Sequence, residues 1–110
     1  MSAQSTDRIR ELNDSFRSTF VGGAVMVTAG VEALEPEAKR RLLERVRDFN
    51  KFEEGNDPYR EHDFGAIELE GDRFLFKIDY YDRKCRSASP DPADPAVTTR
   101  ILTVMRADEY

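Results

Sequence analysis

The feature that most constrains the fold is an alternation of apolar and polar residues over positions 64–81, interrupted once at Gly71-Asp72. Such alternation is typical of strands with one buried face, and a Gly-Asp pair suits a two-residue hairpin turn. With this pair at the centre of the turn, one face of the hairpin carries only apolar pairs: Leu69–Phe74, Ile67–Phe76 and Gly65–Ile78. A slip of one residue would mix the two faces. The sequence therefore predicts this pairing, with the apolar face in the core.

Two helices and two further strands are predicted around the hairpin. Apolar residues spaced by three and four predict a helix over residues 9–20 and another over residues 36–49, where Pro36 suits the first helical position. Candidate N-caps of the first helix are Ser5, Thr6 and Asp7. Segments 24–28 and 97–105 are apolar and β-branched and are predicted to be strands. Together these elements predict an α+β fold of two layers: an antiparallel sheet of three to four strands, with two helices packed on one face.

The length of 110 residues corresponds to one domain, so we expect a single globular domain over residues 1–110. Within it, residues 87–96 contain three prolines, which favour a flexible connecting loop. The single cysteine, Cys85, excludes an intrachain disulfide, and the sequence shows neither a signal peptide nor a membrane span. We therefore expect a cytoplasmic protein with no membrane association.

The predicted register brings the residues before the first hairpin strand beside the end of the second. His62 would then face Tyr81 and lie diagonally from Asp79, while Asp63 would face Tyr80. Imidazole and carboxylate groups in such a cluster can bind a divalent metal, or a carboxylate can orient the histidine as a general base. Mutual hydrogen bonding within the fold is the simpler interpretation, because one histidine alone makes a poor metal site. No metal or cofactor is predicted.

Acidic residues are concentrated in segment 53–72. Eight acidic side chains lie there with one basic side chain, Arg60, in a chain whose formal net charge is -5. This balance disfavours direct nucleic-acid binding and favours a protein partner with a basic surface, although a solubilising surface is the plainer interpretation. The candidate partner-binding residues are Glu61, His62, Glu68, Glu70, Asp79 and Asp82.

Five segments of the chain resemble the DUF3768 family of bacterial domains of unknown function: residues 9–17, 22–31, 56–65, 77–82 and 91–103. Members of that family look like accessory genes of plasmids, prophages and conjugative elements, often beside anti-restriction and DNA-maintenance genes. The resemblance implies a mobile-element protein that binds and disarms host defence machinery, of the anti-CRISPR or anti-restriction type. Such an inhibitor needs surface charge and shape but no catalytic residue.

Two alternatives remain open at this stage. The last strand is faintly similar to that of ribonuclease toxins of toxin-antitoxin systems, and in that interpretation His62, Tyr81 and Arg100 would be the catalytic residues. The acidic balance argues against an RNA-binding face. The chain could also be a purely structural or adaptor domain, and an exposed sheet edge would allow a homodimer.

Overall fold

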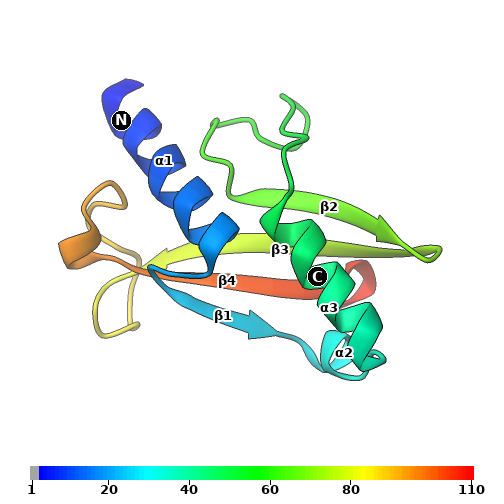
Figure 1. Cartoon of the computed structure of the whole chain (residues 1–110). Coiled ribbons are helices and arrows are strands. Elements are labelled where there is room, and N and C mark those ends of the chain that lie inside the picture. The colour runs from blue at the N-terminus through cyan, green and yellow to red at the C-terminus, as the bar shows by residue number, and fades with distance from the viewer. Residues whose placement is uncertain (1–2) are drawn as a thin grey trace.

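The hairpin lies at one side of a four-stranded sheet (Figure 1). The structure is a computed structural model that describes residues 3–110. The strands are β1 (Ala24–Val27), β2 (Phe64–Leu69), β3 (Asp72–Tyr81) and β4 (Thr99–Arg106), in the order β1-β4-β3-β2. The helices are α1 (Ala3–Thr19), α2 (Ala29–Glu32) and α3 (Pro36–Arg47), and short 3-10 turns lie at Pro95–Val97 and Ala107–Glu109. Helices α1 and α3 cover one face of the sheet, so the α+β class is confirmed.

The sheet is mixed, which corrects the prediction of an antiparallel sheet. Strand β3 is antiparallel to both β2 and β4, but β1 runs parallel to β4, with Ala24 opposite Ile101 and Val27 opposite Val104. Parallel neighbours need a long crossover connection. Here the chain from β1 to β4 supplies it, passing through α3 and the hairpin before it returns. Strand β1 therefore pairs with the last strand of the chain, a choice that no local sequence pattern encodes.

The observed hairpin register differs by two residues from the predicted one. Glu70 and Gly71 are the central turn residues, with φ of 54° and 84°, so both adopt the left-handed conformation that a type I′ turn requires. Leu69 consequently pairs with Asp72, and Ile67 pairs with Phe74. A shift of two residues leaves every side chain on its original face. The predicted apolar face is therefore confirmed, although the predicted pairs are wrong.

Two helical details also differ from the prediction. Helix α1 begins at Ala3, so the three candidate N-caps lie inside the helix, and Asp7 pairs instead with Arg10 at 2.7 Å. The four-residue helix α2 was not predicted, because its sequence is short and contains Gly30. A distant contact holds it, since the backbone N–H of Gly30 donates to the carboxylate of Glu109 at 2.9 Å.

The connection between β3 and β4 folds through side-chain to backbone hydrogen bonds. Asp91 accepts from the N–H of Ala93 at 3.1 Å, and Asp94 accepts from the N–H of Ala96 at 2.9 Å. Pro95 occupies the first position of a 3-10 turn, where no backbone donor is needed. The prolines therefore exclude a continuous ladder of β-sheet hydrogen bonds in this connection, but they permit the single 3-10 turn.

The core lies between the helices and the apolar face of the sheet. Phe76 is fully buried and packs edge-on against Phe49 of the segment after α3, with ring centroids 5.2 Å apart. Its ring passes over Gly65 of β2, where an added Cβ would lie 2.4 Å from a ring carbon of Phe76. Strand β2 thus needs a glycine here, because any larger residue would push the central aromatic ring out of place. The remaining buried apolar residues include Ile9, Phe16, Val31, Leu42, Val46, Ile67, Phe74, Ile78, Leu102 and Val104.

Gly65→Ala should lower the free energy of unfolding by about 1–3 kcal/mol, the usual cost of overpacking a core. Gly55→Ala is the matched control, because an added Cβ there meets nothing within 4 Å. Urea denaturation of both variants measures the difference. Equal stability of the two variants would contradict the packing of Phe76 over β2.

Candidate functional site

Helix α1 buries two polar side chains in the middle of its apolar face. Asn13 is fully buried and Arg17 is only 5% exposed, between the apolar contacts of Ile9 and Phe16. Buried polar groups are costly unless they are hydrogen-bonded. Their partners define the junction, our name for the polar cluster formed by Asn13, Asp14, Arg17, Asp57, Glu61, His62, Tyr80 and Arg100.

Asn13 connects three separate parts of the chain within the junction. Its amide nitrogen donates to the carbonyl of Glu61 at 2.9 Å and to the hydroxyl of Tyr80 at 2.7 Å. Its amide oxygen accepts from Nε of Arg100 at 2.9 Å. The Tyr80 hydroxyl in turn donates to the Glu61 carboxylate at 2.8 Å. One side chain thereby joins α1 to β3, to β4 and to the loop before β2.

Burial determines the ionisation of the two strand residues in the junction. Burial raises the pKa of Tyr80 far above its usual range, and the hydrogen bond to Glu61 raises it further, so the phenol remains a donor. Burial also lowers the pKa of Arg100, partly offset by the carboxylate of Glu61. A guanidinium stays charged despite such a shift.

His62 lies at the open side of the junction. Its φ of 56° turns the ring toward α1, where Nδ1 lies 2.8 Å from the Asp14 carboxylate. Nε2 lies 3.5 Å from the buried carboxylate of Asp57, whose other oxygen accepts from the His62 backbone N–H at 3.0 Å. The ring stacks on Phe52 with centroids 3.8 Å apart. These contacts orient the imidazole, and its side chain is 24% exposed.

A cleft of about 350 Å³ opens beside His62. Its other lining residues are Arg10, Phe52, Glu53, Glu54, Asp57 and Arg60. The walls therefore combine two guanidinium groups with three carboxylates. A histidine held by a carboxylate can transfer protons, but the charges around it do not favour a phosphate-bearing substrate.

The predicted meeting of His62 with Tyr81, and of Asp63 with Tyr80, is wrong. Asp63 lies opposite Ile78, whose N–H donates to its carbonyl at 2.8 Å. The two-residue shift in register and the positive φ of His62 separate the expected partners. Tyr81 lies on the sheet face opposite to Tyr80, because successive side chains alternate.

The remaining candidate residues lie outside the junction. Asp79 pairs with Lys77 at 2.8 Å, and Asp82 accepts hydrogen bonds from two backbone N–H groups of the following loop. Glu70 forms an ion pair with Arg41 of α3. Glu68 leaves its carboxylate in solvent, while its backbone carbonyl accepts from the Arg45 side chain at 3.0 Å.

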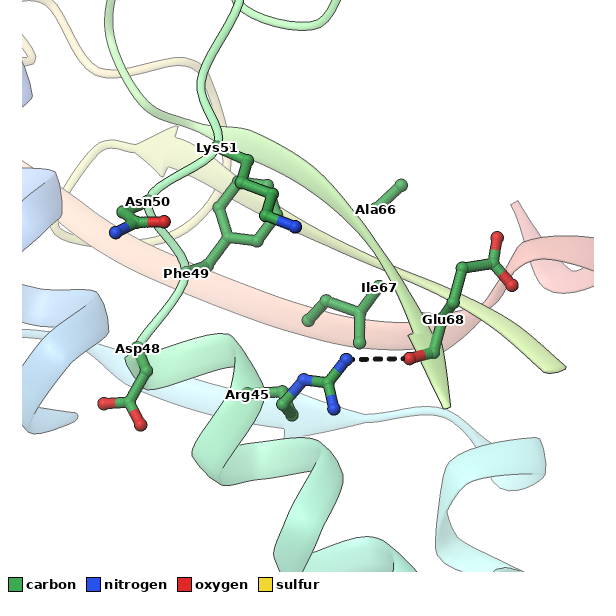
Figure 2. A pocket seen from close by; sticks show the side chains of 8 residues that line it. All are labelled: Arg45, Asp48, Phe49, Asn50, Lys51, Ala66, Ile67 and Glu68. Carbon is green, nitrogen blue, oxygen red and sulfur yellow. Dashed lines mark hydrogen bonds between the residues drawn. The ribbon is translucent and has the colours of Figure 1, made fainter. Parts of the chain in front are cut away.

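A second cleft of about 350 Å³ lies between the end of α3 and the outer edge of β2 (Figure 2). Figure 2 shows the Arg45 side chain reaching the Glu68 carbonyl across it. In the observed register, Ala66 and Glu68 direct their backbone groups toward this free edge. Lys51 lines the cleft farther from the turn.

No group of three or more His, Cys, Asp or Glu in residues 3–110 is placed to hold a metal ion. No helix within the same residues is long and apolar enough to cross a membrane.

The fold and the junction define a class of small two-layer α+β domains that have a mixed sheet and a buried polar contact between the first helix and the central strands. Residues 27–109 match the family described as Protein of unknown function (DUF3768), and the chain belongs to this family. No curated protein and no solved structure shows a significant match.

Sequence reasoning did not identify Asn13, Asp14 and Arg17 as parts of the site. Arg17 donates to Asp14 at 3.0 Å and to the carbonyl of Phe49 at 3.1 Å, and its guanidinium carbon lies 5.1 Å from the centre of the Phe52 ring. The available signal was position, because Asn13 follows Ile9 by four residues and precedes Phe16 by three. It therefore lies on the buried stripe.

Asn13→Ala should lower the free energy of unfolding by about 2 kcal/mol, because it leaves Nε of the buried Arg100 without an acceptor and removes the N–H donor to the Tyr80 hydroxyl. Ser15→Ala, on the exposed side of α1, should change it by less than about 0.5 kcal/mol. Chemical denaturation measures both. Similar losses for the two variants would show that the junction does not fix the helix.

Asp63→Asn should stabilise the protein at pH 7. Burial, followed by the nearby carboxylate of Glu61, raises the pKa of Asp63, so folding disfavours its charged form. The charged Asp63 side chain therefore lowers the free energy of unfolding at pH values above its pKa in the folded protein. This loss of stability disappears as the pH falls through that value and below the unfolded value of about 3.9.

Denaturation midpoints from pH 3 to pH 7 measure this effect. The Asp63→Asn curve should lie above the wild-type curve at pH 7 and converge with it at the acidic end. Glu54→Gln, an exposed control, should follow the wild type. A constant offset at every pH would contradict the titration of Asp63.

Proposed function

We propose that this protein is a non-enzymatic binding module that attaches to the basic surface of a partner protein. We assign to that attachment the inhibition of a host defence complex that handles nucleic acid. The protein would then be an inhibitor of the anti-CRISPR or anti-restriction type. The observation that carries the proposal is a group of exposed carboxylates on the edge strand β2, on its turn to β3 and in the loop that precedes it: Glu53, Glu54, Glu68, Glu70 and Asp72. We call this group the acidic edge.

The carboxylates of the acidic edge differ in how far they are neutralised. Glu70 pairs with Arg41, and Asp72 pairs with Arg106 at 3.2 Å. Glu53 and Glu54 precede β2, while Glu68 lies near its end, and none of these three carboxylates forms an ion pair with another described residue. Three side chains therefore keep their full charge on the surface. They are best suited to meet lysine or arginine side chains of a partner.

The geometry of β2 supports an extended contact. The strand has six residues, so its exposed edge is about 20 Å long at the usual rise per residue. Negative charge spread over that length complements an elongated basic groove, of the kind that holds a nucleic-acid backbone. A protein that occupies such a groove would inhibit the partner to which the groove belongs, without any chemical step.

The ribonuclease alternative has less support. His62 is oriented by Asp14, as a general base would be, but its cleft also contains three carboxylates. Arg100 donates to Asn13 inside the junction, and Tyr81 lies on the opposite face of the sheet from Tyr80. The three residues that this mechanism requires do not share one cleft.

The acidic edge can be tested by charge reversal. The triple variant Glu53→Lys, Glu54→Lys, Glu68→Lys should lower the affinity for a captured defence complex at least tenfold, because it opposes the basic groove with like charge. A variant with the same total charge, carrying Glu11→Lys, Glu35→Lys and Asp108→Lys, is the matched control, since its changes lie in α1, before α3 and after β4.

The measurement combines capture and inhibition. Tagged protein is incubated with purified CRISPR and restriction complexes, with and without their nucleic acid, and target cleavage is followed. Equal capture by both triple variants would contradict the role of the acidic edge. Failure of the wild type to bind any of these complexes would overturn the defence assignment. Growth arrest on expression, relieved by His62→Ala, would favour the ribonuclease instead.

A further inference from the structure

A pocket at the end of the sheet away from the hairpin turn is lined by positive charge, whereas the chain as a whole is negative. Its lining residues come from α1, from the segment before β1, from the connection between β3 and β4 and from the start of β4. These segments meet at the left of Figure 1. The volume of the pocket is about 180 Å³, and its lining residues are Leu12, Ser15, Phe16, Val21, Gly22, Arg83, Pro95, Thr98 and Arg100. Two of these residues are arginines and none is acidic, in a chain with a net charge of -5.

Arg100 is the buried cation of this pocket. The residue is 3% exposed, and its guanidinium donates to two neutral oxygens, those of Asn13 and Pro92. Its carbon lies 5.3 Å from the centre of the Tyr80 ring. No carboxylate of residues 3–110 forms an ion pair with it, although buried charges are normally paired. The positive charge is therefore solvated by dipoles and forms no ion pair, although the Glu61 carboxylate offsets part of the lowering of its pKa by burial.

Arg83 supplies a second cation on the exposed side. Its Nη1 donates to the carbonyl of Thr98 at 3.3 Å, and no described carboxylate pairs with it. Outside the pocket, the charges of Arg8 and Glu61 have opposite effects on the pKa of Arg100, since Arg8 lowers it and Glu61 raises it. An anion entering the pocket would thus meet positive charge from β4 and from the loop after β3.

We propose that the Arg83–Arg100 pocket binds the phosphate group of a small phosphomonoester. Two guanidinium groups suit a tetrahedral oxyanion, because each presents several donors in a planar fork. Leu12, Phe16 and Val21 form an apolar wall beside them, which suits the carbon skeleton attached to the phosphate. This site goes beyond the proposed partner binding and uses a different part of the surface.

Binding is measured by isothermal titration with three probes: inorganic phosphate, adenosine 5′-monophosphate and adenosine. Amide NMR shifts of Gly22 and the Nε–H signal of Arg100 report whether a probe enters the pocket. We expect adenosine 5′-monophosphate to bind at least fivefold more tightly than inorganic phosphate, and adenosine to give no shift at Arg100.

Arg83→Gln should raise the dissociation constant for the monophosphate at least fivefold. Arg83 is exposed, so this change should leave the fold intact, and Arg86→Gln in the same loop but outside the pocket should have no effect. If inorganic phosphate binds as tightly as the monophosphate, the phosphomonoester assignment is overturned in favour of free phosphate. Absence of binding by both, or equal binding of adenosine, would overturn the anion site altogether. None of these results depends on the capture of a defence complex.

Discussion

The architecture depends on the hydrogen bonds that Asn13 makes inside an otherwise apolar interface. A helix that packs on a sheet through apolar contacts alone can rotate or slide at little cost, whereas a buried amide with three partners is satisfied in one position only. Asn13 is bonded to Tyr80 of β3, Arg100 of β4 and the carbonyl of Glu61. The orientation of α1 and the path of the loop before β2 are thereby determined together. The cleft beside His62 follows from that loop path.

The sequence was sufficient to predict which hairpin residues face the core, but not which residues pair. Alternation defines a face, and every shift by two residues preserves it. The pairing instead depends on the turn, where Glu70 adopts a positive φ that a glutamate rarely takes. The parallel pairing of β1 with β4 was beyond prediction for a related reason. It depends on how the whole chain folds, because the four residues of β1 do not themselves specify the strand with which they pair.

The candidate site could be predicted only in part. His62 and Arg100 were identified by residue type, and both lie in the junction, but their partners come from α1. A polar residue within an apolar stripe is usually assigned to the edge of the stripe, so Asn13 and Arg17 passed unnoticed. A positive φ at His62 then turns its ring away from Asp79. Local patterns therefore find reactive side chains more readily than they find the neighbours that define their chemistry.

The distribution of charge explains how an exposed edge strand can remain available for a partner. Strand β2 presents unpaired backbone groups, and such an edge would readily pair with a second copy of itself. The exposed carboxylate of Glu68 on β2 opposes that pairing by like-charge repulsion, while in the proposed function it attracts a basic surface. At the far end of the sheet the imbalance is reversed, because Arg83 and Arg100 have no acidic neighbour in the pocket. Arg100 donates to the neutral oxygens of Asn13 and Pro92, and the Glu61 carboxylate acts on it without forming an ion pair. Its lack of a paired carboxylate allows the proposed binding role in addition to the structural role that its bond to Asn13 already gives it.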